Sequence, residues 1–172
     1  MTPKIYTKQG DQGGTSMPSV GKVSKTHERI VAVGDLDELN AHLGMIASFL
    51  GDDAKEMVES IQSTLLSIGA EIATLENLAD TKAPQSEMAA QLEGAIDGMT
   101  AELDPLKNFI LPGGTTQSAA VHIARAVCRR AERSLVALGY PVVYINRLSD
   151  FLFTLARVVN KATGGTESIW KR

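Results

Sequence analysis

Four arginines lie within one short segment of the chain, residues 125–133, and three of them recur at four-residue spacing. On an α-helix this spacing places Arg125, Arg129 and Arg133 on one face as a stripe of permanent positive charge. Arginine suits phosphate because its planar guanidinium donates two parallel hydrogen bonds and stays protonated. The segment is therefore a candidate phosphate site. The commoner alternative is a solvated helix face on which Glu132 is an intrahelical partner.

A second set of candidate phosphate ligands lies near the N-terminus, where residues 5–16 read IYTKQGDQGGTS. Three glycines let the backbone turn its N–H groups toward a ligand, and Lys8, Thr15 and Ser16 add side-chain donors. The loop is neither a Walker A motif nor a dinucleotide-binding fingerprint, because it lacks the residue spacing of both. A mobile polar terminus is the alternative interpretation.

The arginine stripe belongs to a long predicted helix. Residues 109–116 read FILPGGTT, an apolar segment followed by a proline and glycine turn and then by hydroxyl residues suited to begin a helix. We expect this helix to run from about residue 115 to 138. The next predicted helix carries Asn146 and Asp150 on one face. Antiparallel packing of the two helices would bring that polar strip within reach of the arginines.

Apolar residues at helical spacing predict helix almost throughout the chain after residue 28. Three further apolar stripes precede the two helices above and span residues 36–50, 61–75 and 88–103. The expected breaks are a linker at 78–86 and Asp104–Pro105 after the third stripe. The predicted fold is all-α, a five-helix antiparallel bundle with a non-helical N-terminal arm. We expect one domain over residues 1–172, made of the arm at 1–27, the bundle at 28–163 and a tail at 164–172.

Composition narrows the function classes. A net charge of -3 over 172 residues argues against a nucleic-acid binder, because the positive charge is local. The single cysteine, Cys128, excludes an internal disulfide framework, and no cysteine and histidine cluster has the spacing of a zinc site. No apolar run reaches the roughly 18 residues of a membrane span, and the start lacks a signal-peptide core. We therefore expect a cytoplasmic protein that binds no membrane.

Five motifs, in this order, resemble the PduO-type ATP:cob(I)alamin adenosyltransferases. They are the loop at 5–16, GDLDELN at 34–40, FILPGG at 109–114, RRAER at 129–133 and NRLSD at 146–150. We expect GDLDELN to begin a helix. The resemblance spans nearly the whole chain. It departs where Gly-Asp-Leu-Asp replaces the family's Gly-Thr-Val-Asp and where the connection at 139–143 is short, and neither difference changes a residue type that the chemistry needs.

The resemblance implies transfer of the adenosyl group of ATP to the cobalt of a reduced cobalamin, with triphosphate as the leaving group. Cobalt is the nucleophile, so the protein needs no serine, cysteine or general base, and no protein metal ligands are expected. Magnesium would bridge the phosphate oxygens. The implied ATP contacts come from the arm and from two helices: Thr7, Lys8, Gln9, Gly10, Thr15, Ser16, Lys25, Arg129, Arg130, Glu132, Arg133 and Asn146.

The resemblance also assigns roles on the corrinoid side. Phe109 matches a hydrophobic wall that keeps the lower axial ligand off cobalt, although from the residues alone a core phenylalanine is the favoured interpretation. Asp37 and Arg125 match an ion pair between neighbouring subunits. With Arg129, these residues form the expected catalytic set. Family members are homotrimers with sites between subunits, and a reductase and an adenosylcobalamin-dependent enzyme are candidate partners.

Two other function classes stay open. A nucleotide-sensing or corrinoid-delivery protein would keep the ATP site without efficient turnover, and the presence of Phe109, Asp37, Arg125 and Asn146 argues against that loss. A ferritin-like di-iron bundle has a similar architecture. The chain lacks the paired Glu-x-x-His motifs that a di-iron site needs.

Overall fold

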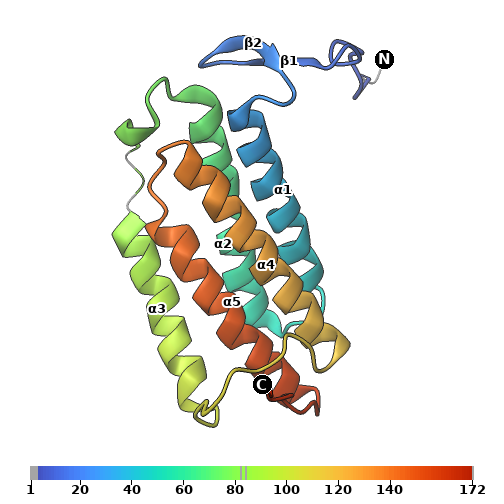
Figure 1. The fold of residues 1–172 in the computed structure, drawn as a ribbon, viewed down its shortest axis with the longest axis vertical. Coiled ribbons are helices and arrows are strands. Elements are labelled where there is room, and N and C mark those ends of the chain that lie inside the picture. Colours follow the sequence, from blue (N-terminus) through green and yellow to red (C-terminus); the bar gives the residue numbers. More distant parts are fainter. Residues whose placement is uncertain (1–3, 82, 84, 172) are drawn as a thin grey trace.

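Five helices make up the bundle in the computed structural model, which describes residues 4–81, 83 and 85–171. They run alternately up and down (Figure 1) and are α1 (Glu28–Ala47), α2 (Asp52–Thr74), α3 (Gln85–Ala101), α4 (Thr116–Ala137) and α5 (Val143–Ala162). A short 3-10 turn, η1 (Leu78–Asp80), lies between α2 and α3. The predicted five-helix antiparallel bundle is confirmed.

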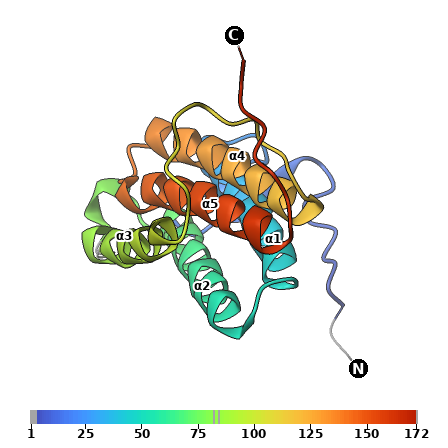
Figure 2. The same cartoon turned by 90° about the horizontal axis from the view of Figure 1, so that it is seen from below.

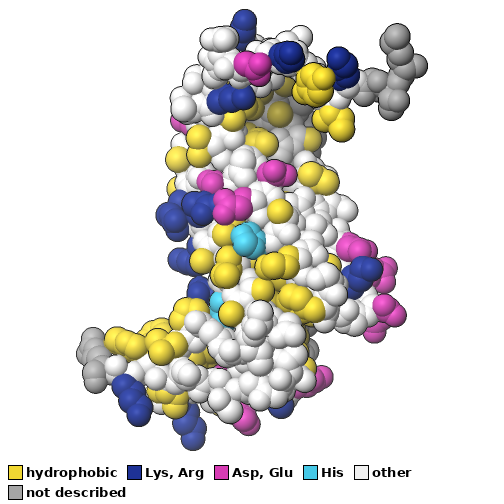
Figure 3. Space-filling view, turned by 90° about the vertical axis from the view of Figure 1, so that its right-hand side faces the viewer, with side chains coloured by type: hydrophobic (Ala, Val, Ile, Leu, Met, Phe, Trp, Pro, Cys, Tyr) yellow, Lys and Arg dark blue, Asp and Glu magenta, His cyan; other side chains and the backbone are white. Residues whose placement is uncertain are grey.

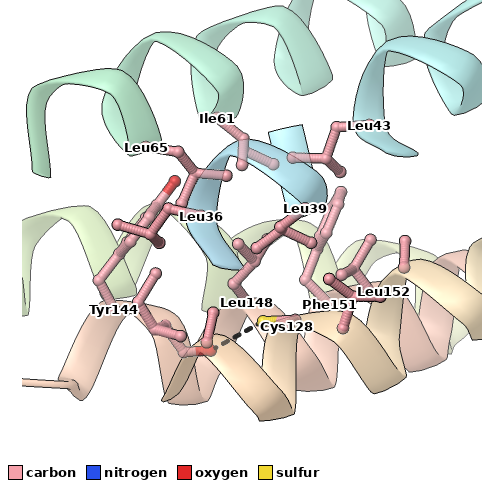
Figure 4. Packing of buried hydrophobic residues seen from close by; sticks show 14 of the residues in the cluster. Leu36, Leu39, Leu43, Ile61, Leu65, Cys128, Tyr144, Leu148, Phe151 and Leu152 are labelled. Carbon is pink, nitrogen blue, oxygen red and sulfur yellow. Dashed lines mark hydrogen bonds between the residues drawn. The ribbon is translucent and has the colours of Figure 1, made fainter. Parts of the chain in front are cut away.

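The predicted apolar stripes supply the core. Figure 4 shows Leu39 and Leu43 of α1, Leu65 of α2, and Leu148 and Leu152 of α5 pointing into one cluster. Each of these side chains is at most 1% exposed. Burial of one leucine stabilises a fold by about 1.5–3 kcal/mol, so this cluster holds the helices together.

Two helix boundaries differ from the sequence prediction. The GDLDELN motif at 34–40 lies inside α1, not at its start. The helix begins earlier because the Nδ1 atom of His27 accepts the N–H of Arg29 and caps it. At the other end of the bundle, α3 ends at Ala101, before the expected break at Asp104–Pro105.

Residues 102–115 form an extended connection that we call the strap. It passes across the lower end of the bundle from α3 to α4, where it crosses the C-terminal tail (Figure 2). Ile110 of the strap and Ile169 of the tail form an antiparallel β-bridge. The strap and the tail are therefore joined although about 60 residues separate them in sequence.

The N-terminal arm contains a β-hairpin that the sequence analysis did not predict. Its strands are β1 (Gly14–Met17) and β2 (Gly21–Ser24), which pair antiparallel. They were missed because four-residue strands rich in glycine and serine carry little apolar alternation. Met17 is buried, and the N–H of Ser19 donates to the carbonyl of Ala73 near the end of α2 over 3.1 Å.

Arg29 fastens this hairpin to two helices. Its buried guanidinium donates to the hydroxyl of Ser19 at 3.0 Å and to the carbonyls of Ile72, Leu75 and Glu76 at 3.0, 2.5 and 2.7 Å. The last carbonyls of a helix lack intrahelical partners and favour a cation, so Arg29 completes the end of α2. The hairpin is thus fixed at the upper end of the bundle, while residues 4–13 reach away from it (Figure 1).

Candidate functional site

The arginine stripe lies along the accessible side of α4, since α1 and α5 cover the opposite side. Arg129 and Arg133 are exposed and Arg125 is half-buried. The Nη1 atom of Arg133 donates to the carbonyl of Arg129 over 2.8 Å, which orders that side chain along the helix. Two exposed guanidinium groups therefore lie one helical turn apart on one surface.

The polar strip of α5 lies beside the stripe, as the antiparallel arrangement predicts. The amide nitrogen of Asn146 donates to Glu132 Oε1 at 2.7 Å. This contact orients Glu132 toward α5. The predicted ATP contacts Glu132 and Asn146 are therefore adjacent, although 14 residues separate them in sequence.

Arg130 points away from the stripe and toward α1. Its Nε atom donates to Asp35 Oδ1 at 3.0 Å, and it forms a second ion pair with Glu38. The hydroxyl of Ser134 donates to Asp35 Oδ2 at 2.5 Å. Arg130 thus links α4 to α1, and its predicted contact with ATP would require it to leave these carboxylates.

Asp37 and Arg125 make no ion pair with each other in the part of the chain that the structure describes. Asp37 is exposed on α1 and borders an apolar groove of about 440 Å³ between α1 and α2. Leu66, on the α2 side of that groove, is 64% exposed. The Nε atom of Arg125 is buried and has no hydrogen-bond partner among the described residues. An unsatisfied buried donor costs about 1–3 kcal/mol.

The glycine-containing loop before the hairpin has an unusual backbone. Lys8 has φ of 61°, in the left-handed region that non-glycine residues rarely adopt. Such a conformation costs about 1–3 kcal/mol and is common at ligand-binding sites. The N–H of Gln9 donates to the hydroxyl of Thr7 over 3.5 Å. These three predicted ATP contacts therefore lie together on the exposed part of the arm.

Lys25 lies against the same loop. A Cβ atom placed on Gly10 would lie 3.0 Å from its Nζ atom, and its N–H donates to the carbonyl of Gly13 over 2.9 Å. Thr15 and Ser16 lie on β1, which stands between the glycine-containing loop and Lys25 in sequence. The hairpin thus brings Lys25 to the predicted ATP contacts that precede it in sequence.

Phe109 is an exposed residue of the strap, so the interpretation as a core phenylalanine is wrong. Its side chain is 80% exposed and its ring lies edge-on to that of Trp170, with 6.3 Å between ring centroids. Both rings and Phe153 of α5 line an open groove of about 750 Å³. Figure 3 shows hydrophobic side chains gathered at this lower end of the molecule. Apolar surface concentrated in this way is typical of a binding site.

Trp170 and Phe153 were missed by the sequence analysis. Trp170 is the only tryptophan of the chain, and it lies in a tail segment without helical apolar periodicity. A large aromatic residue in such a segment is a signal for binding that could have been used. Phe153 carried no comparable signal, because it reads as one more apolar residue of α5.

The two groups of candidate residues lie at opposite ends of the bundle. The arm is at the upper end and the strap with Phe109 is at the lower end (Figure 1). Between them lies the length of α1, whose 20 residues span roughly 30 Å at a rise of 1.5 Å per residue. One copy of the chain therefore does not bring the arm and the aromatic groove together.

The described side chains give little support to a cysteine nucleophile or to a metal site formed by the protein. Burial raises the pKa of the Cys128 thiol to about 12, and this thiol donates to the carbonyl of Ile145 over 3.4 Å. A thiol with this pKa is protonated near neutral pH, which makes it a poor nucleophile. Within residues 4–81, 83 and 85–171 there is no cluster of three or more His, Cys, Asp or Glu side chains that could hold a metal ion. The helices described are also too short or too polar to cross a membrane.

Comparison with known proteins identifies the family. Residues 5–159 match the cobalamin adenosyltransferase family. The chain belongs to that family. The cobalamin adenosyltransferase of Cupriavidus metallidurans is 44% identical, with 98% of this chain and 95% of the relative covered. The corrinoid adenosyltransferase of Bos taurus is 38% identical, with 99% of this chain and 77% of the relative covered. The resemblance to adenosyltransferases is confirmed.

Solved structures of this adenosyltransferase family share the fold. A phenylalanine-to-alanine variant of the PduO-type ATP:corrinoid adenosyltransferase from Lactobacillus reuteri, complexed with cobalamin and ATP, is 34% identical and has a TM-score of 0.90. The match covers 98% of this chain and all of that one. An arginine-to-lysine variant, complexed with ATP, has a TM-score of 0.87 at the same identity and covers 97% of this chain and 100% of that one.

Proposed function

We propose that this protein transfers the 5′-deoxyadenosyl group of ATP to the cobalt of a reduced cobalamin, giving adenosylcobalamin and triphosphate. Family membership supports the reaction class, and structures of similar enzymes contain both substrates. The observation that carries the proposal for this chain is the exposure of Phe109 beside Trp170. A ring that is 80% exposed contributes little to folding, and the apolar face of a flat macrocycle such as a corrin would cover it.

The ATP end of the site stabilises the leaving group. In the reaction, cobalt forms a bond to the 5′ carbon of the ribose while the bond from that carbon to the triphosphate oxygen breaks. The electron pair of the broken bond leaves with the triphosphate. Arg129 and Arg133, with Lys8 and Lys25 from an arm, supply fixed positive charge where this negative charge accumulates. No general base is needed, because no proton is transferred.

The corrinoid end of the site supplies an apolar surface. Phe109 would stand below the cobalt and keep water and the lower axial ligand away. Trp170 and Phe153 would extend that wall along the groove. A cobalt that lacks its lower donor is easier to reduce, so this surface would prepare the nucleophile rather than act on ATP.

The site is shared between neighbouring copies of the chain, and we propose a homotrimer. Cobalt must contact the ribose of ATP, so the arm that binds ATP and the groove that binds the corrinoid must adjoin. Within one chain they lie at opposite ends. The exposed carboxylate of Asp37 on one copy would satisfy the buried Nε of Arg125 on the next. The unpartnered Nε of Arg125 supports this proposed contact, while the number of three subunits rests on the resemblance.

Magnesium would enter this site with ATP. The described residues form no carboxylate cage for it. This fits an ion that keeps its waters and binds mainly through substrate phosphates. Bound there, the ion would lower the charge repulsion among the phosphates. We also propose that the protein is cytoplasmic. Its proposed protein partners are a reductase and an adenosylcobalamin-dependent enzyme.

The direct test is to mix the protein with ATP and chemically reduced cobalamin under anaerobic conditions. Formation of a light-sensitive cobalt–carbon product would support the proposal, and a reaction without ATP is the control. If ATP binds and no such product forms, the chain is a nucleotide-sensing or corrinoid-delivery protein instead.

A further inference from the structure

We propose that the ion pair between the buried guanidinium of Arg157 and the partly exposed carboxylate of Glu167 positions Phe109 and Trp170 for the corrinoid step. Arg157 is 8% exposed on α5, and its Nε donates to Glu167 Oε1 at 2.6 Å. This proposal deepens the proposed function, because it rests on the groove at Phe109 as the corrinoid site. It assigns positioning roles to two residues that touch neither substrate.

One guanidinium holds two segments of chain at once. The Nη2 atom of Arg157 donates to the carbonyl of Asp104 at 2.8 Å and to Glu167 Oε2 at 3.4 Å. Asp104 is in the strap and Glu167 is in the C-terminal tail. Arg157 therefore fixes both segments to α5 at one point. The fork of arginine allows this, since it donates in several directions within one plane.

Farther along the chain the strap and the tail pair antiparallel beside the two rings. The N–H of Leu111 donates to the carbonyl of Ser168 at 2.8 Å, and the N–H of Trp170 donates to the carbonyl of Phe109 at 2.8 Å. The rings of Phe109 and Trp170 meet just beyond these hydrogen bonds. A shift of either segment at Arg157 would therefore be transmitted to both rings.

Core packing alone does not fix these rings, because Phe109 is 80% and Trp170 is 47% exposed. The paired backbone of the strap and the tail therefore contributes to their positions. Phe153, which lines the same groove, precedes Arg157 by one helical turn and shares its face of α5. The ion pair thus lies next to the groove that it would organise. Removal of Glu167 would leave the buried charge of Arg157 uncompensated.

The single tryptophan of the chain makes the idea testable. In Glu167→Gln, which keeps the shape of the side chain and removes its charge, the emission of Trp170 should move to longer wavelength and become easier to quench with iodide. The KM for cobalamin should rise or kcat should fall on the order of 10- to 100-fold, since a displacement of about 1 Å can cost that much. The KM for ATP should not change. Glu167→Asp keeps the charge, so its tryptophan emission and its kinetic constants for cobalamin should return part of the way to the wild-type values.

A matched control is Glu93→Gln, which breaks another ion pair of α5, that of Glu93 with Arg147 at 2.8 Å, on an exposed surface. It should leave tryptophan emission and both KM values as they are. Unchanged emission and quenching in Glu167→Gln would overturn the proposal, even if that variant melts at a lower temperature. Emission reports the position of Trp170 without turnover. If the wild-type protein made no cobalt–carbon product, the proposed function would fail while the emission test of the ion pair still gave its answer.

Discussion

Arg129 is the residue whose replacement most directly tests the ATP end of the site. It is exposed in the middle of α4, so alanine there should change stability little. We expect Arg129→Ala to lower kcat about 100- to 1,000-fold, the usual cost of losing a donor to a developing negative charge. Arg129→Lys should recover only part of this, because a point charge cannot donate in a bidentate fork. Steady-state kinetics measures both.

The control for Arg129 is Lys55→Ala, which removes an exposed cation on α2 that pairs with Glu59, four residues later. Its kinetics should match those of the wild type. Near-normal turnover of Arg129→Ala would mean that the arginine stripe is a solvated helix face and not a phosphate site.

Phe109→Ala tests the corrinoid end. The ring is 80% exposed, so the free energy of unfolding should change by about 0.5 kcal/mol or less, and not by the roughly 3–5 kcal/mol of a core phenylalanine. The absorption of four-coordinate cob(II)alamin in the ATP-bound enzyme should diminish, because water or the lower ligand can return to the cobalt. Calorimetry and absorption spectroscopy on one sample check both results.

Met45→Ala, at a 44% exposed position on α1, is a suitable comparison for Phe109→Ala, since it also truncates an accessible apolar side chain. It should leave the spectrum intact. Full retention of the four-coordinate signal in Phe109→Ala would refute the role of the ring.

At the scale of elements, the turn that joins the strap to α4 depends on Gly114. Its φ is 96°, and a Cβ atom there would lie 2.1 Å from Asn160 Oδ1. That oxygen accepts the N–H of Thr115, the N-cap residue of α4, over 3.0 Å. Gly114→Ala should therefore destabilise the protein by about 1–3 kcal/mol, through backbone strain and loss of this contact.

The neighbouring Gly113 provides a control for that prediction. A Cβ atom there would meet no atom within 4 Å, and the backbone of Gly113 is not left-handed. Gly113→Ala should unfold close to the wild-type midpoint in urea. Equal midpoints for the Gly113→Ala and Gly114→Ala variants would contradict the argument.

At the scale of the whole molecule, sedimentation should report a trimer, and ATP should protect the arm from protease. Asp37→Arg should weaken assembly and activity together, because it places a second cation against Arg125. Combining Asp37→Arg with Arg125→Asp should restore assembly, since the charges then complement each other between copies. A stable monomer with full activity would exclude a shared site.

The sequence by itself determined the helices and their order, and it supplied the residue types of the proposed ATP site. Period and turn chemistry are local properties, so the stripe of Leu36, Leu39 and Leu43 and the start of the arginine helix at about residue 115 could be read directly. The side-by-side placement of Glu132 and Asn146 also followed, because short connections force neighbouring helices to be antiparallel.

Only the tertiary structure decided which side chains are exposed and which distant segments meet. Phe109 reads as a core residue in sequence, yet it is exposed because the strap lies outside the bundle and pairs with the tail. The contacts of Arg29 with the end of α2, and of Arg157 with the strap and the tail, join residues that no spacing rule connects. They depend on where the helix ends come to lie, and that position is fixed by packing of the whole bundle and not by any local pattern of residues.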